Sequence, residues 1–169
     1  GMMHLLLARH LGAEHVIVAG HHKSRLAVAL LLGASAAVDE REASLPDLVR
    51  DFTRGRGVDV VVAAAASPAA IEAGTRLLRK AGTIILFGGC PPGSSIALDP
   101  NRVHYDELVL TGSFNCTSDD YQRAMHLIHD LRAEALITQR LPLERIVEGF
   151  DAVLQHEGMK AVVVMESPS

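Results

Sequence analysis

The stretch VDVVVAAAASPAAIEAGTRLLRKAGTIILF, residues 58–87, decides the fold of this chain. It opens with a Val-rich run at 58–63 and closes with a second apolar run at 83–87. Between them, Ser67 and Pro68 give the signal of a helix start, a capping serine followed by a proline in the first turn. Two continuous apolar runs joined by one helix predict a strand–helix–strand unit, whose parallel strands are buried on both faces of a sheet.

The same alternation continues on both sides of this unit. Toward the N-terminus it predicts helices over 2–11, 24–32 (capped by Ser24) and 44–53 (capped by Ser44), with strands over 15–19 and 36–38. Toward the C-terminus it predicts a loop over 88–101, strands over 107–114 and 161–165, and helices over 119–134 and 143–155. We therefore predict an α/β fold with a doubly wound, mostly parallel sheet.

Composition narrows the class of protein. The chain has 169 residues, 49% of them hydrophobic and 21% charged, which is enough apolar material for the core of one domain. A formal net charge of -4 gives no general attraction to nucleic acid or to an anionic membrane. The apolar runs are shorter than the roughly 20 residues that span a bilayer. Cys90 and Cys116 form neither a disulfide framework nor a CxxC motif, which favours a reducing cytoplasm.

Several catalytic motifs are missing from the sequence. It contains no GxSxG nucleophile elbow and no P-loop. Short-chain dehydrogenases need a lysine four residues after a tyrosine, and neither Tyr105 nor Tyr121 has one. His126 and His129 have helical spacing, but without a third ligand we interpret them as an ordinary surface pair. We predict no catalytic residue and no metal ligand in this chain.

A series of short segments, spaced along nearly the whole chain, resembles a known family. The segments are GMMHLLLARHLGA at 1–13, VIVA at 16–19, RLA at 25–27, LGA at 32–34, GVDVVV at 57–62, LRKAGTIILFGG at 78–89, ELVLTGSF at 107–114, LITQRLPL at 136–143 and KAVVV at 160–164. In this order they resemble the coenzyme domain of medium-chain, zinc-type dehydrogenases, especially the sorbitol and threonine dehydrogenase branch. The resemblance implies a Rossmann-like fold and NAD(P)-dependent hydride transfer between nicotinamide and an alcohol or carbonyl.

The resemblance also implies that the front of this fold is incomplete. Gly1 aligns with the last glycine of the GxGxxG turn, where a missing Cβ allows close packing of helix on strand. The alternative is that Gly1 is an extraneous residue before an initiating Met2. In both cases the usual first strand and most of the glycine turn are missing, and in the strand order 3-2-1-4-5-6 that strand is central. The position of this missing central strand is here called the slot. We expect either the strand over 161–165 or residues outside this sequence to fill it.

The residues that follow the predicted strand over 15–19 bear on the choice of cofactor. NAD-dependent members carry an acidic residue there, which binds the adenosine ribose, whereas this chain has Gly20. The donors and cations that follow are suited to a 2′-phosphate, and they are His21, His22, Lys23 and Arg25. This pattern favours NADP over NAD. The alternative is that these residues form only a solvated loop.

Two further segments align with cofactor contacts of the family. Phe87, Gly88 and Gly89 match the backbone beside the nicotinamide ribose, and Gly112, Ser113 and Phe114 match the segment that holds the carboxamide. For each glycine the alternative role is a plain turn or close packing. One segment departs from the family, because residues 63–66 are four alanines where polyol dehydrogenases often have Glu-Cys-Thr-Gly. These alanines lack the polar side chains that the resemblance implies on the adenosine side.

Taken together, these features predict a single, incomplete dinucleotide-binding domain over residues 1–169. The catalytic GroES-like domain, where the family holds its zinc, is absent from the sequence, so we expect the isolated chain to bind the dinucleotide weakly and to turn nothing over. A noncatalytic remnant kept for assembly is the alternative. The resemblance also implies edge-to-edge pairing of coenzyme domains, which suggests a homodimer or larger homo-oligomer through the strand over 107–114 or its neighbours. The substrate and the parent enzyme's dependence on zinc stay open, because zinc-free quinone reductases share the fold.

Overall fold

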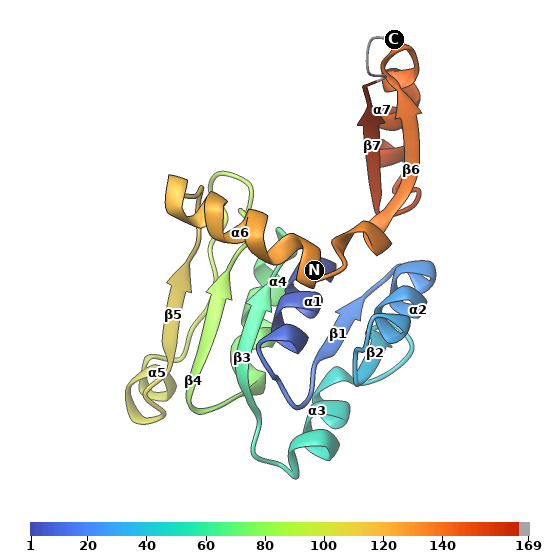
Figure 1. Cartoon of the computed structure of the whole chain (residues 1–169). Helices are drawn as coiled ribbons and strands as arrows, with labels where there is room; N and C mark the ends of the chain where they lie inside the picture. The colour runs from blue at the N-terminus through green and yellow to red at the C-terminus, as the bar shows by residue number, and fades with distance from the viewer. Residues whose placement is uncertain (166–169) are drawn as a thin grey trace.

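A computed structural model describes residues 1–165 of the chain (Figure 1). Its strands are β1 (Ile17–Gly20), β2 (Ala36–Asp39), β3 (Val58–Ala63), β4 (Leu78–Leu86), β5 (Val109–Gly112), β6 (Ile137–Pro142) and β7 (Lys160–Val164). Its α-helices are α1 (Met2–His10), α2 (Lys23–Leu31), α3 (Leu45–Thr53), α4 (Pro68–Leu77), α5 (Pro100–Tyr105), α6 (Ser118–Asp130) and α7 (Ile146–Leu154). Two 3₁₀ turns are η1 (Ala133–Leu136) and η2 (Leu143–Arg145). The predicted α/β class is confirmed.

The strands form three separate sheets, all of them parallel. β1 pairs with β2, β4 lies between β3 and β5, and β6 pairs with β7. The first two sheets match the order of a Rossmann fold whose central strand is missing, because β1 and β3 would be that strand's neighbours. Within residues 1–165 no strand lies between β1 and β3.

The expectation that the strand over 161–165 fills this slot is wrong. That strand is β7, and it pairs in parallel with β6, with Arg140 opposite Val162 and Leu141 opposite Val163. α7 connects the two strands and contacts both of them. β6, α7 and β7 thus form a strand–helix–strand unit, here called the C-terminal unit, in which β7 pairs with the strand that precedes it along the chain.

The main core lies between α4 and the sheet of β3, β4 and β5. Ser67 caps α4 as predicted, since its side chain accepts a hydrogen bond from the Ala70 amide. Ile71 on α4 and Ile84 on β4 are 4% and 0% exposed. Alternate β3 side chains point to the other side of the sheet, where Val60 is 54% exposed. The prediction that this strand is buried on both faces is therefore wrong.

Some element boundaries differ from those predicted. The helix α5 and the strand β6 occupy segments for which no helix or strand was expected. α2 begins one residue before Ser24, and His22 takes the capping position without a side-chain hydrogen bond. Ser24 therefore lies inside the first turn. By contrast, Ser44 caps α3 as expected, by accepting from the Asp47 amide.

The C-terminal unit projects from the rest of the molecule in Figure 1. Gly149 and Ala152 are the buried residues of its helix α7. The outer side of the unit carries exposed apolar residues at helical spacing, which are Leu143, Val147, Phe150 and Leu154, and we call them the α7 stripe. No helix in residues 1–165 combines the length and the apolar character that a membrane span requires.

Candidate functional site

The predicted site residues lie at the carboxyl ends of parallel strands. His21 and His22 follow β1, Phe87 follows β4, and Ser113 and Phe114 follow β5. Figure 1 shows the arrowheads of β3, β4 and β5 pointing to one side, the side on which α6 lies. In open α/β sheets ligands bind in the crevice at this edge, so the residues are placed where a cofactor site belongs.

The loop that follows β4 is held tightly against its neighbours. The amide of Gly88 donates to the Ala63 carbonyl at the end of β3, at 2.9 Å. A Cβ on Gly88 would lie 2.8 Å from the Ala64 oxygen and 2.8 Å from the Ala65 carbonyl carbon. Only a residue without a Cβ allows this approach, so Gly88 serves close packing. Gly89 differs, because a Cβ there would meet nothing within 4 Å.

Phe87 and Ser113 join this loop to other parts of the predicted site. The ring of Phe87 meets the ring of His4, in the first turn of α1, edge to face at 4.4 Å. The Ser113 amide donates to the Leu86 carbonyl at 3.2 Å, which ties the ends of β4 and β5 together. Phe114 is 92% exposed beside them. The structure thus brings the predicted nicotinamide-side residues into one region.

His4 is a member of this region that the sequence did not single out. Its Nδ1 is buried and has no hydrogen-bond partner among the described residues. Burial lowers the pKa of His4. The ring is therefore held in its neutral form against Phe87.

At the ends of β1 and β2 the structure builds a charged cluster around Asp39. The Asp39 side chain is 4% exposed and accepts from Nε of Arg41 at 2.9 Å and from the Arg41 amide at 3.1 Å. Nδ1 of His21 lies 3.6 Å from the same carboxylate. The hydrogen bonds from the Arg41 side chain hold the pKa of Asp39 well below its usual range. Arg41 also donates to the His21 carbonyl, so it bridges the two strand ends.

Two of the predicted phosphate ligands already have partners. Nζ of Lys23 lies 2.5 Å from Oε1 of Glu42. Arg25 donates from Nε to the Gly158 carbonyl at 3.2 Å and from Nη2 to the His156 carbonyl at 3.3 Å. The cationic loop is therefore less free than its sequence suggested, and Arg25 connects it to the C-terminal unit.

The remaining predicted glycines stand in open surroundings. A Cβ on Gly20 would touch only Cδ2 of Leu26, at an ordinary 3.8 Å, and one on Gly112 would meet only the Leu86 oxygen at 4.0 Å. A Cβ on Gly1 would meet no atom within 4 Å. The close packing expected of Gly1 is not seen, because the strand on which α1 would pack is missing from residues 1–165.

The sequence analysis did not single out Asp39, Arg41 or His4. Asp39 ends β2 and Arg41 lies two residues beyond it, and a carboxylate and a guanidinium at a strand end are a usable signal. The contact of His4 with Phe87 joins segments far apart in the sequence, so no local pattern indicates it. The slot also separates the predicted residues into one group beyond β1 and another beyond β4 and β5.

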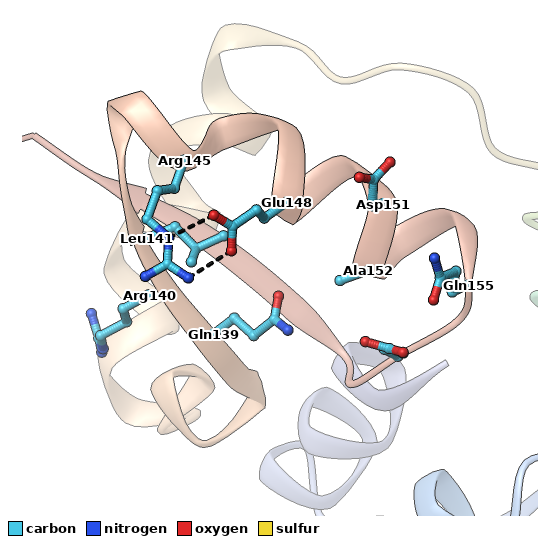
Figure 2. A pocket seen from close by; sticks show the side chains of 9 residues that line it. Gln139, Arg140, Leu141, Arg145, Glu148, Asp151, Ala152 and Gln155 are labelled. Atoms are coloured by element: carbon cyan, nitrogen blue, oxygen red, sulfur yellow. Dashed lines mark hydrogen bonds and ion pairs between the residues drawn. The ribbon is translucent and has the colours of Figure 1, made fainter.

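A hollow of about 380 Å³ lies elsewhere, between β6 and α7 (Figure 2). Arg140 and Arg145 lie toward one end of it, and Asp151 and Gln155 toward the other. Arg145 donates to both carboxylate oxygens of Glu148, at 2.7 and 2.6 Å. None of the predicted site residues lines this hollow. No group of three or more His, Cys, Asp or Glu suited to a metal occurs among residues 1–165.

Known proteins resemble this chain over most of its length. The family described as zinc-binding dehydrogenase matches residues 1–130. An L-threonine 3-dehydrogenase from Vibrio cholerae is 29% identical over 168 residues, which are 98% of this chain and 48% of that protein. The Idiomarina loihiensis enzyme of the same name is 27% identical over 96% of this chain and 48% of its own length. The chain thus spans about half the length of these relatives.

Solved structures agree with these relatives. An alcohol dehydrogenase from Thermotoga maritima superposes with a TM-score of 0.89 and 26% identity, over 98% of this chain and 47% of that one. A zinc-binding dehydrogenase from Sinorhizobium meliloti, solved with NADP, gives a TM-score of 0.77 and 25% identity, over 98% of this chain and 49% of its own. The chain therefore belongs to the zinc-binding dehydrogenase family and has the Rossmann-like fold of its coenzyme-binding domain.

Proposed function

We propose that this chain binds a nicotinamide dinucleotide along the carboxyl edge of its sheets. In a protein of the relatives' length, it holds the cofactor while hydride passes between nicotinamide and an alcohol or carbonyl. The observation that supports this most is the gathering of Phe87, Gly88 and Ser113 beside the first turn of α1. In this fold the nicotinamide end of the cofactor lies beyond the same strands.

We propose NADP rather than NAD as the cofactor. Gly20 places no carboxylate at the end of β1, and Asp39 at the end of β2 is occupied by Arg41. The exposed donors near this point are His21 and His22, and the adjacent Lys23 is paired with Glu42. The Sinorhizobium meliloti relative solved with NADP supports the proposal. The Lys23 and Arg25 contacts weaken it, since both cations have partners already.

Calorimetric titration of the chain with NADP and with NAD tests both proposals. The wild type is expected to bind NADP more tightly. Gly20→Asp should reverse the preference, because a carboxylate there repels a 2′-phosphate and accepts from the ribose hydroxyls of NAD. A Cβ at Gly20 meets only Cδ2 of Leu26, at an ordinary 3.8 Å. Gly12→Asp serves as the matched control, although its positive φ of 85° lowers stability. A wild type that prefers NAD contradicts the choice of cofactor, and one that binds neither contradicts dinucleotide binding.

Catalysis itself is proposed to need the half of the relatives' length that this chain does not span. No metal-binding cluster occurs in residues 1–165, so no zinc-dependent step is assigned to them. We propose that this other half forms the separate catalytic domain and covers the α7 stripe, since apolar side chains in a row mark contact surfaces. Assays of the chain alone with L-threonine or simple alcohols should show no turnover. Measurable oxidation by the chain alone would contradict this division.

We also propose that the chain forms a dimer and that it is located in the cytoplasm. β5 is an edge strand whose Val109 is 50% exposed, and we propose that two copies pair through it. Both cysteines are free thiols, which is compatible with the proposed reducing cytoplasm. Equilibrium sedimentation of the chain tests the dimer. A monomer at all concentrations would contradict it.

A noncatalytic remnant is a second candidate, and one observation favours it. Ala64, Ala65 and Ala66 are exposed at the end of β3 and offer no polar side chain to the adenosine. A remnant predicts that NADP and NAD fail to bind even when the half of the relatives' length that this chain does not span is supplied. Restored binding on adding that half would exclude the remnant.

A further inference from the structure

We propose that the loop between α7 and β7 forms a second wall of the nucleotide site, in which His156 faces a phosphate of the ligand and Arg25 is the positioning residue that holds the loop there. The proposal rests on dinucleotide binding at the end of β1. It adds a binding residue from the C-terminal unit, which the strand-end residues alone would not indicate.

Arg25 connects α2 to the loop between α7 and β7. It lies in the first turn of α2, directly after the cationic loop that follows β1. Its guanidinium spans two carbonyls of the other unit, those of His156 and Gly158, at 3.3 and 3.2 Å. These partners lie 131 and 133 residues further along the chain. A guanidinium has five N–H donors, so three remain for a ligand.

The loop has a defined shape that presents His156. The backbone of His156 is left-handed, with φ of 58°, and its amide donates to the Val153 carbonyl at 3.1 Å. The Met159 amide donates to Oγ1 of Thr138 at 3.0 Å. Gly158 is also left-handed, and a Cβ there would collide with Oγ1 of Thr138. Hydrogen bonds therefore connect the loop both to Thr138 on β6 and to Arg25 on α2.

His156 faces His22 across the junction. Their ring centroids lie 5.4 Å apart with the planes inclined at 41°. Both residues are exposed, and neither side chain has a hydrogen-bond partner within residues 1–165. Two imidazoles at this spacing can both donate to oxygens of one phosphate, and the nearby Arg25 charge favours an anion over a metal cation. The ligand class is thus a nucleotide phosphate.

Calorimetry with NADP and with NAD tests the wall. His156→Asn and His22→Asn should each weaken NADP binding roughly tenfold, as expected when one charge-assisted hydrogen bond is lost. His129→Asn, on the exposed surface of α6, is the matched control and should change nothing. If only the affinity for NADP falls, the contact is assigned to the 2′-phosphate. If the affinity for both dinucleotides falls, it is assigned to the pyrophosphate. Unchanged affinity in both variants overturns the proposal, as does Zn²⁺ binding that His156→Asn abolishes while NADP affinity stays the same.

Hydrogen exchange of the nucleotide-free chain tests Arg25 separately. Arg25→Gln should speed exchange of the amides at 156–159, and Arg50→Gln, which removes an exposed arginine on α3, should not. Equal exchange in Arg25→Gln and the wild type overturns the positioning role, even if the wild type binds NADP. If the wild type binds neither dinucleotide, the proposed function is wrong. Faster exchange in Arg25→Gln would still show that Arg25 holds the loop in place.

Discussion

At the scale of single residues, Gly88 gives the sharpest test of how the site is built. Gly88→Ala would force its new Cβ against the backbone of Ala64 and Ala65, at 2.8 Å. We expect a loss of about 1–3 kcal/mol in the free energy of unfolding, because neither backbone segment can move without breaking its own contacts. Gly89→Ala is the control, since its Cβ would meet nothing. Urea denaturation measures the free energy of unfolding of both variants. Equal stability would contradict the prediction and show that the loop shifts to make room for the Cβ.

His4 makes a prediction about pH. Its pKa in the folded chain is lowered by burial, so folding favours the neutral ring. A lowered folded pKa means full stability above the unfolded pKa of about 6.5, and a loss as the pH falls below that value. His4→Phe should make the melting temperature less dependent on pH between about 6.5 and 5 than in the wild type. The exposed His129→Gln is the control. If the melting temperature of His4→Phe changes with pH as steeply as that of the wild type, the prediction is wrong.

At the scale of elements, α6 depends on its first turn. α6 has no buried residue, so packing gives it little support. Thr117 accepts from the Asp120 amide at 3.2 Å, and Asp120 accepts from the Thr117 amide at 3.0 Å. Thr117→Ala should lower local stability by about 1 kcal/mol, seen as faster amide exchange along α6. Ser118→Ala, one residue inside the helix, should leave exchange nearly unchanged. If the two variants behave alike, the cap is not what stabilises α6.

The elements also show how far the sequence could predict this structure. β3, α4 and residues 83–86 of β4 were predicted because their signals are local: an apolar run, a capping serine and a glycine. The start of β4 at Leu78 was not predicted, since the helix was expected to run to Arg79. β6 was missed because its six residues alternate only weakly and end in Pro142. Its stability comes from pairing with β7, more than 15 residues away, and such pairing leaves no local pattern. The strand-end placement of His21, Phe87 and Ser113 was predictable, whereas the partners of Arg25 were not.

At the scale of the whole molecule, residues 1–165 leave three surfaces uncovered: the slot edges of β1 and β3, the edge strand β5 and the α7 stripe. In the chain alone, where no other domain covers it, the stripe predicts self-association. Phe150→Glu places a charge on a side chain that is 63% exposed, so it should reduce association and alter the free energy of unfolding by no more than about 0.5 kcal/mol. Light scattering at increasing concentration measures the effect. Leu11→Glu, a single exposed leucine at the end of α1, is the control and should reduce association less.

The bridge from Arg25 to the carbonyls of His156 and Gly158 also constrains the order of folding during synthesis. A ribosome that adds roughly 5–20 residues per second completes the partners of Arg25 on the order of ten seconds after Arg25 itself. Throughout this interval any structure that α2, β1 and β2 have formed lacks the bridge. The C-terminal unit can close onto them only after residues 156–158 have been made, so this contact forms later than the local contacts within α2, β1 and β2.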